Sequence, residues 1–143
     1  LPILIFVTAC GYSPMYSSKN SQLFNIKIIN LEGDNKINSI LRLKLKNHKN
    51  INSELYTISV NTIFEKKDLS KNIAGNTVSY QINVTSTFNV TKGEANKIIT
   101  INRNFNTQTF SDKFEERNYE NRLKEDIAKY IYQKFILQIS RDL

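Results

Sequence analysis

Two long stretches in the middle of the chain alternate between larger apolar and smaller or polar residues. Larger side chains occupy every second position from Tyr56 to Phe64 and again from Val78 to Val90, where Ser86 is the only gap. A period of two places such residues on one face of a β-strand. Both stretches are therefore predicted to be strands with one buried face.

Two more strands flank this pair. An Ile-rich run from Phe24 to Leu31 ends at a Glu-Gly-Asp turn, and alternating residues from Ile99 to Thr109 follow a Thr-Lys-Gly turn. The polar segment from Lys66 to Asn76 contains a glycine, and we interpret it as a protruding loop between the second and third strands. The last three strands are then predicted to form an antiparallel meander.

Helical periodicity appears in two places. Asp34 or Asn35 can cap a short helix whose apolar positions include Ile37 and Leu41. A second, longer helix is predicted near the C-terminus, where apolar residues recur at every fourth position. This row consists of Leu123, Ile127, Ile131, Phe135 and Ile139.

The order of these elements is β-α-β-β-β-α, which predicts an α+β fold. We expect a two-layer sandwich in which two helices cover one face of a four-stranded, mostly antiparallel sheet. With 143 residues the chain has the length of one domain, which we assign to residues 23–143.

The N-terminus has the pattern of a lipoprotein signal. Apolar residues from Leu1 to Val7 are followed by Thr8, Ala9 and Cys10, the only cysteine. Small residues before a cysteine, after an apolar segment, are typical of a bacterial lipobox, so residues 1–9 are interpreted as an N-terminally truncated signal peptide and 10–22 as an acylated linker. The alternatives are a buried strand with a core cysteine and a transmembrane segment, for which the run is short.

Composition adds little to this interpretation. The formal charge of +7 and a pI of about 9.5 suit a phosphate-bearing partner, nucleic acid or anionic lipid, but also reflect a chain rich in Lys, Asn and Ile. Tyr80 and Phe88 share a strand face with Val and Ile, which favours a core role over stacking on nucleic acid. We therefore expect no nucleic-acid partner.

Residues suited to catalysis are scarce. His48, the only histidine, lies in an Asn- and Lys-rich segment without a nucleophile at recognisable spacing, and Glu115 and Glu116 are interpreted as residues at the start of a helix. We expect no enzymatic activity, no metal site and no cofactor other than a covalent lipid on Cys10.

The residues that begin with Cys10 resemble a known family. The run Cys-Gly-Tyr-Ser-Pro-Met-Tyr, residues 10–16, is similar to the mature start of LptE, the lipopolysaccharide-assembly lipoprotein, in its alphaproteobacterial branch. The predicted order of strands and helices and the pattern of the C-terminal helix also resemble that family.

This resemblance implies an outer-membrane lipoprotein on the periplasmic face that plugs the LptD β-barrel and assists lipopolysaccharide transport. Lys66, Lys67 and Lys71 in the predicted loop, together with Lys92 in the following turn, are the candidate lipopolysaccharide contacts. The alternative is a lipoprotein that serves another envelope machine, such as a secretion pilotin or a transporter's auxiliary subunit.

Overall fold

The computed structural model describes residues 24–48 and 54–142. Cys10, the signal peptide assigned to residues 1–9 and the linker assigned to 10–22 lie outside the described residues. Within them the chain forms six elements in the predicted order. They are β1 (Asn25–Gly33), α1 (Asn35–Lys46), β2 (Leu55–Lys71), β3 (Thr77–Lys92), β4 (Ala95–Gln108) and α2 (Lys113–Asp142).

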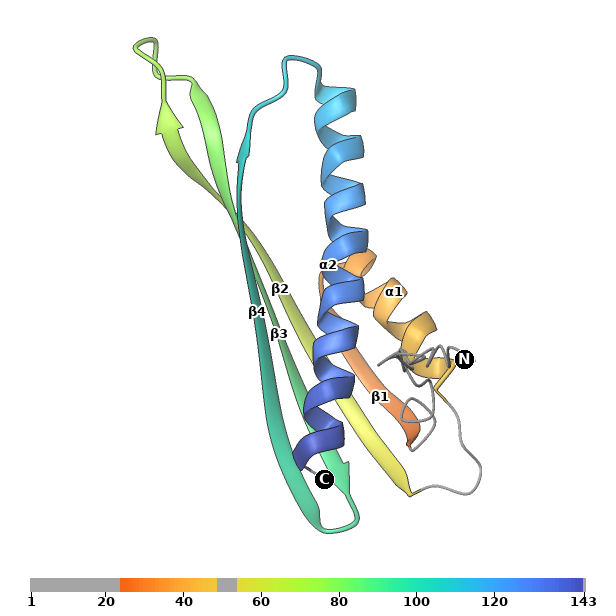
Figure 1. Cartoon of the computed structure of the whole chain (residues 1–143). Helices are drawn as coiled ribbons and strands as arrows, with labels where there is room; N and C mark the ends of the chain where they lie inside the picture. The colour runs from red at the N-terminus through yellow and green to blue at the C-terminus, as the bar shows by residue number, and fades with distance from the viewer. Residues whose placement is uncertain (1–23, 49–53, 143) are drawn as a thin grey trace, which may run out of the picture.

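The four strands form one mixed sheet in the order β1-β2-β3-β4. β1 runs parallel to β2, whereas β2, β3 and β4 are antiparallel neighbours. Both helices lie on the same side of the sheet (Figure 1). The α+β class, the two layers and the antiparallel meander are therefore confirmed.

The predicted loop from Lys66 to Asn76 is wrong. β2 continues to Lys71 and β3 begins at Thr77, so only residues 72–76 join the two strands. Backbone pairing continues through the polar residues, with Lys66 opposite Ile82 and Lys67 opposite Gln81. An alternating apolar pattern marks only the part of a strand that a second layer covers, and this extension of the hairpin reaches beyond the helices (Figure 1).

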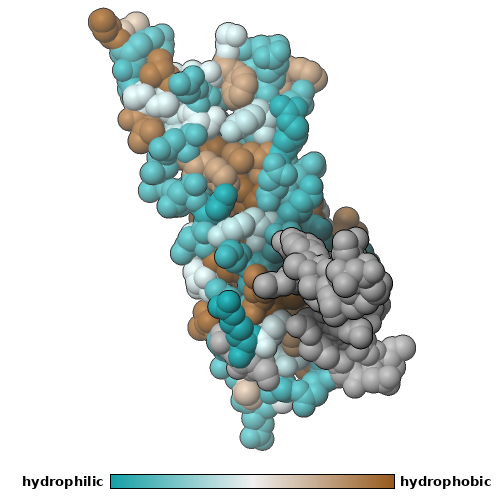
Figure 2. Space-filling view, viewed as in Figure 1, coloured by the Kyte–Doolittle hydropathy of each residue, from teal (hydrophilic) through white to brown (hydrophobic). Residues whose placement is uncertain are grey.

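Apolar side chains gather at the free end of this hairpin, seen at the upper left in Figure 2. Leu69, near the end of β2, is half exposed, and Ile73, in the connection, is fully exposed. The turn is closed by hydrogen bonds of Asn72, whose carbonyl accepts from the Gly75 amide at 2.9 Å. The hairpin end thus makes little contribution to the core.

The core lies between the sheet and the two helices. The predicted α2 row is confirmed, since Ile127, Ile131, Phe135 and Ile139 are at most 1% exposed. The Phe135 ring stacks on the Phe88 ring of β3 with centroids 4.2 Å apart. Full burial of each such side chain contributes about 1.5–3 kcal/mol, which makes this row the main attachment of α2.

The gap at Ser86 has a structural explanation. Ser86 lies opposite Thr62 in the β2–β3 register, and both side chains are fully buried. Their hydroxyl oxygens are 2.8 Å apart, so one hydroxyl donates a hydrogen bond that the other accepts. A buried hydroxyl without a partner costs about 1–3 kcal/mol, and the pairing avoids that cost inside the apolar layer.

Gly33 fixes the connection from β1 to α1. It pairs with Thr62 at the end of β1, and its φ of +95° is unfavourable for residues with a side chain. A Cβ atom there would lie 1.8 Å from the Thr62 carbonyl oxygen. The same oxygen accepts a hydrogen bond from the Asp34 amide at 2.9 Å, so β2 and the start of α1 meet at this glycine.

Replacing Gly33 with Ala is expected to lower the free energy of unfolding by about 3 kcal/mol or more, because strand pairing must break to admit the methyl group. Gly93→Ala is the matched control, since Gly93 also has a positive φ, of 58°, but a methyl group there would meet no atom within 4 Å. That control should lose about 1–2 kcal/mol. Urea denaturation measures both, and equal losses would contradict the role given to the close approach.

Candidate functional site

The contact between α2 and the sheet changes from apolar to charged along the helix. Glu116, Glu120 and Lys124 follow one another at every fourth position, and the next residue in this row is the fully buried Ala128. The row therefore faces the inside of the sandwich. Its charged part lies near the start of α2, where the extended β2–β3 hairpin separates from the helix (Figure 1).

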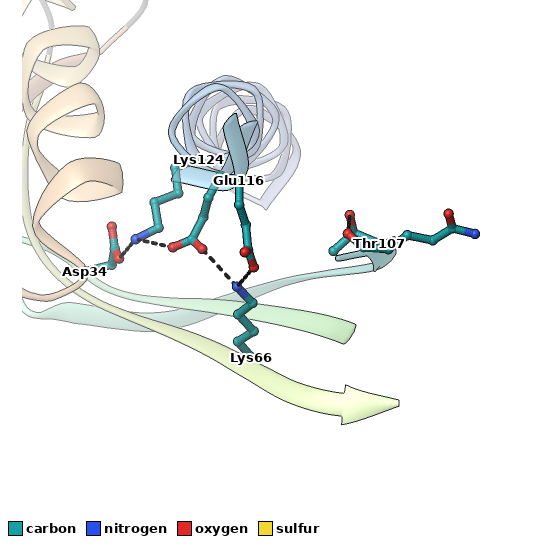
Figure 3. Close-up of polar contacts among 7 residues, drawn as sticks. Asp34, Lys66, Thr107, Glu116 and Lys124 are labelled. Carbon is teal, nitrogen blue, oxygen red and sulfur yellow. Dashed lines mark hydrogen bonds and ion pairs between the residues drawn. The ribbon is translucent and has the colours of Figure 1, made fainter. Parts of the chain in front are cut away.

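Five side chains of alternating charge meet at this place, and we call them the charge network (Figure 3). The chain of contacts runs from Asp34 through Lys124, Glu120 and Lys66 to Glu116. The Nζ-to-oxygen distances are 2.8 Å from Lys124 to Asp34, 3.6 Å from Lys124 to Glu120, 3.4 Å from Lys66 to Glu120 and 3.0 Å from Lys66 to Glu116. The network links α1, α2 and β2.

Both lysines of the network also lie over aromatic rings. The Lys66 Nζ is 4.3 Å from the centre of the Tyr80 ring, and the Lys124 Nζ is 4.3 Å from the centre of the Phe64 ring. Such cation–π contacts contribute about 0.5–2 kcal/mol, more where the cation is shielded from water. The apolar stems of these lysines thereby continue the core where the apolar row of α2 ends.

Lys66 is held in its charged form. Burial alone would lower its pKa, but the hydrogen bond to Glu116 and the charge of Glu120 outweigh burial, so the pKa of Lys66 lies above its usual value. Its side chain is 29% exposed, compared with 15% for Lys124 and 13% for Asp34. The network is thus partly shielded from water, and its ion pairs are stronger than pairs on an open surface.

Asp34 connects the network to the start of α1. One of its carboxylate oxygens accepts from the Ile37 amide at 2.9 Å, which confirms Asp34 as the helix cap. The other accepts from Lys124 at 2.8 Å. A single side chain therefore caps α1 and fixes its position against α2.

The four candidate lysines do not form one site. Lys66 lies on the inner face of β2 within the charge network, whereas Lys67 pairs with Glu65 at 3.5 Å on the outer face. Lys71 lies at the end of β2, with Asp68 at 3.9 Å. Lys92 is the last residue of β3, at the end of the sheet away from the β2–β3 turn, where it pairs with Glu54.

His48 follows α1 and is buried, although the sequence places it in a polar segment. Its ring stacks on Phe24 with centroids 5.8 Å apart, and its Nδ1 atom is 3.2 Å from the Tyr132 hydroxyl. Burial lowers the pKa of His48 and raises the pKa of Tyr132. The buried imidazole thus belongs to the packing between α1, β1 and α2.

Two further features are absent from the described residues. Within residues 24–48 and 54–142, no group of three His, Cys, Asp or Glu side chains lies close enough together to hold a metal ion. Glu115 and Glu116 lie in the first turn of α2, as expected, and Glu116 pairs with Lys66. In the same ranges no helix has the length and apolar character needed to cross a membrane.

Sequence reasoning missed the charge network. The spacing of Glu116, Glu120 and Lys124 could have indicated a common helix face. It could not indicate the partners, because Lys66 lies 50 residues before Glu116 and Asp34 lies 90 residues before Lys124. The apolar row of α2 has the clearer four-residue period, so it dominates the sequence pattern of this segment.

Lys66→Met is expected to lower the free energy of unfolding by about 1–2 kcal/mol, because Glu116 and Glu120 lose the cation between them. Lys67→Met is the matched control on the next residue of the same strand. Its side chain is 64% exposed, and its loss should stay within about 0.5 kcal/mol. Thermal and urea unfolding report the difference, and a control that loses as much as Lys66→Met would refute a structural role specific to Lys66.

No family model and no curated protein sequence matches the chain. Solved structures that are similar to it include three bacterial lipoproteins. Rare lipoprotein B from Shewanella oneidensis has a TM-score of 0.55 at 16% identity, with 80% of this chain and 98% of that chain covered. A lipoprotein from Caulobacter crescentus has a TM-score of 0.55 at 8% identity, with 86% of this chain and 91% of that chain covered. Lipoprotein B from Nitrosomonas europaea has a TM-score of 0.52 at 15% identity, with 83% of this chain and 86% of that chain covered. The chain shares the fold of these lipoproteins.

Proposed function

We propose that this protein is an outer-membrane lipoprotein, anchored through acyl chains on Cys10, that pairs with an LptD-type β-barrel and acts as its plug and assembly partner in lipopolysaccharide transport. It works by binding and carries out no covalent chemistry, with no catalytic residue and no cofactor beyond its lipid. The periplasmic face of the outer membrane is its proposed location.

The observation that carries this proposal is the shared fold with rare lipoprotein B, a member of the LptE family, over nearly all of that protein's length. The element order β-α-β-β-β-α was expected from the sequence for the same family. The Cys-Gly-Tyr-Ser-Pro-Met-Tyr run at residues 10–16 supports the proposal independently, because its Gly, Pro and Tyr residues are not needed for acylation.

Anchoring through Cys10 has a simple physical basis. Each buried methylene of an acyl chain contributes about 0.8 kcal/mol, and a single chain gives only reversible binding. A diacylglycerol on the thiol, with a further chain on the amine, would hold the protein at the membrane permanently. The folded domain itself then needs no apolar surface for membrane attachment.

The two faces of the sheet suit a plug. Helices cover one face (Figure 1), and the other face presents mostly polar side chains, with Ile63 and Ile98 as exposed exceptions, so the domain can lie within a polar, water-filled lumen without exposing its core. Lys67 and Lys71 remain the more accessible candidate contacts for the phosphates of lipopolysaccharide, with side chains 64% and 58% exposed. Lys66 would have to leave two carboxylates to take that role, and Lys92 would have to leave Glu54.

Affinity purification of the tagged full chain from detergent-solubilised outer membrane tests the proposal. We expect a large β-barrel protein to be recovered in stoichiometric amount, and we expect Cys10→Ala to abolish signal processing and outer-membrane recovery. Ser13→Ala is a suitable control near the proposed anchor. Recovery of a secretin or a transporter instead of a barrel would favour the alternative envelope machines, and normal membrane recovery of Cys10→Ala would remove the anchor.

A further inference from the structure

A groove lies between β1 and α1, which run side by side at one margin of the sheet (Figure 1). It consists of two adjoining hollows of about 410 and 300 Å³, which share Leu31 and Arg42 in their walls. None of the five residues of the charge network lines either hollow. We call this region the β1–α1 groove, and its walls include Ile29, Leu31, Asn38, Arg42, Leu43 and Lys46.

One buried hydrogen-bond acceptor in the β1–α1 groove has no partner. Asn38 is only 6% exposed, and its Nδ2 atom donates to the Glu32 carbonyl of β1 at 2.7 Å. Within the described residues, its Oδ1 atom accepts no hydrogen bond. Because an unpaired buried acceptor is unfavourable, Asn38 indicates a donor that a bound molecule supplies.

The groove also carries two cations without counter-charges. Arg42 and Lys46 lie four residues apart on α1, so their side chains share one face of the helix. Both are exposed, and within residues 24–48 and 54–142 neither forms an ion pair, a hydrogen bond or a ring contact. By contrast, Lys36 at the start of α1 pairs with Glu125 at 3.1 Å. The groove therefore has a positive charge that favours a carboxylate.

β1 presents a free backbone edge beside the groove. It is an edge strand of the described sheet, and its backbone groups that point away from β2 can pair with a further strand. A bulge after Ile28 leaves Ile29 without a partner on β2, which shortens the stretch that can pair. Side-chain contacts must then supply part of the binding. Ile29 on β1 and Leu43 on α1, which are 67% and 65% exposed, offer apolar contacts.

We propose that the β1–α1 groove binds an extended segment of a partner protein, which adds to the edge of β1 and carries at least one Asp or Glu residue. Its backbone amides pair with β1 and supply the donor for Asn38, and its carboxylate pairs with Arg42 and Lys46. A phosphate group supplies no such row of donors. The described residues that line the groove include no aromatic ring on which a sugar could stack. This site is separate from the barrel pairing proposed above and does not depend on it.

Two synthetic peptides test the groove. The acidic probe is Thr-Val-Asp-Val-Asp-Val-Thr, and the basic probe has Lys in place of both Asp residues. Fluorescence anisotropy measures the binding of each labelled peptide to the purified full chain in detergent. We expect the acidic probe to bind about tenfold more tightly or better, because it alone offers carboxylates to Arg42 and Lys46.

Variants of the two cations assign the binding to the groove. Arg42→Gln with Lys46→Gln should weaken the acidic probe by about tenfold or more. Lys113→Gln with Arg117→Gln is the matched control and should stay within about twofold, because these exposed cations also lie four residues apart, at the start of α2. Arg42→Glu with Lys46→Glu should reverse the preference between the probes. Thermal unfolding should show that all these variants are folded.

Amide hydrogen exchange locates the bound peptide. We expect slower exchange in β1 and unchanged exchange in β4, which is the other edge strand of the described sheet. Failure of the acidic probe to bind at millimolar concentration, equal binding of the two probes, or slower exchange in β4 instead of β1 overturns this inference. Each of these results leaves the barrel proposal standing, because that proposal is tested by recovery of a barrel from the membrane.

Discussion

The structure depends on the packing of one apolar row of α2 against the single apolar face of the sheet. Phe135 on Phe88 is the centre of this contact, and Ile127, Ile131 and Ile139 extend it along the helix. Because most apolar side chains of β2, β3 and β4 point to one side, with Ile63 and Ile98 as exposed exceptions, the helices have one face to cover. The other face then stays open, and its chemistry is free to serve a purpose other than folding.

The charge network extends the attachment of α2 past the end of the apolar row. Lys66 and Lys124 bring their stems over Tyr80 and Phe64. Their charges are compensated by the carboxylate of Asp34, which caps α1, and by carboxylates of α2. Apolar residues at these positions would be only half covered, since the hairpin and the helix separate there. Paired charges with apolar stems suit such a half-exposed location, and they also align α1 through Asp34.

The fold was predictable from the sequence because its signals are periodic. Alternation marked the covered parts of β2, β3 and β4, and the four-residue spacing from Leu123 to Ile139 marked α2. The extension of β2 to Lys71 was not predictable from that pattern, because its polar side chains lack the burial that produces alternation. The charge network and the packing of His48 against Tyr132 depend on contacts between distant segments, which no local pattern contains. Charge and place in the sequence indicate the candidate lysines, whereas their ion-pair partners depend on the folded arrangement of β2, β3 and α2.

The covered face builds the domain, and the central proposal is that this lipid-anchored domain pairs with an outer-membrane β-barrel. Its most direct test is a photoreactive amino acid in the lipidated protein of living cells, placed at position 104 on the open face of β4 or at position 121 on α2. The proposal predicts a crosslinked product with a large outer-membrane β-barrel protein from at least one of these positions, identified by mass spectrometry. Crosslinks to a secretin or a transporter, with none to a barrel, would contradict it.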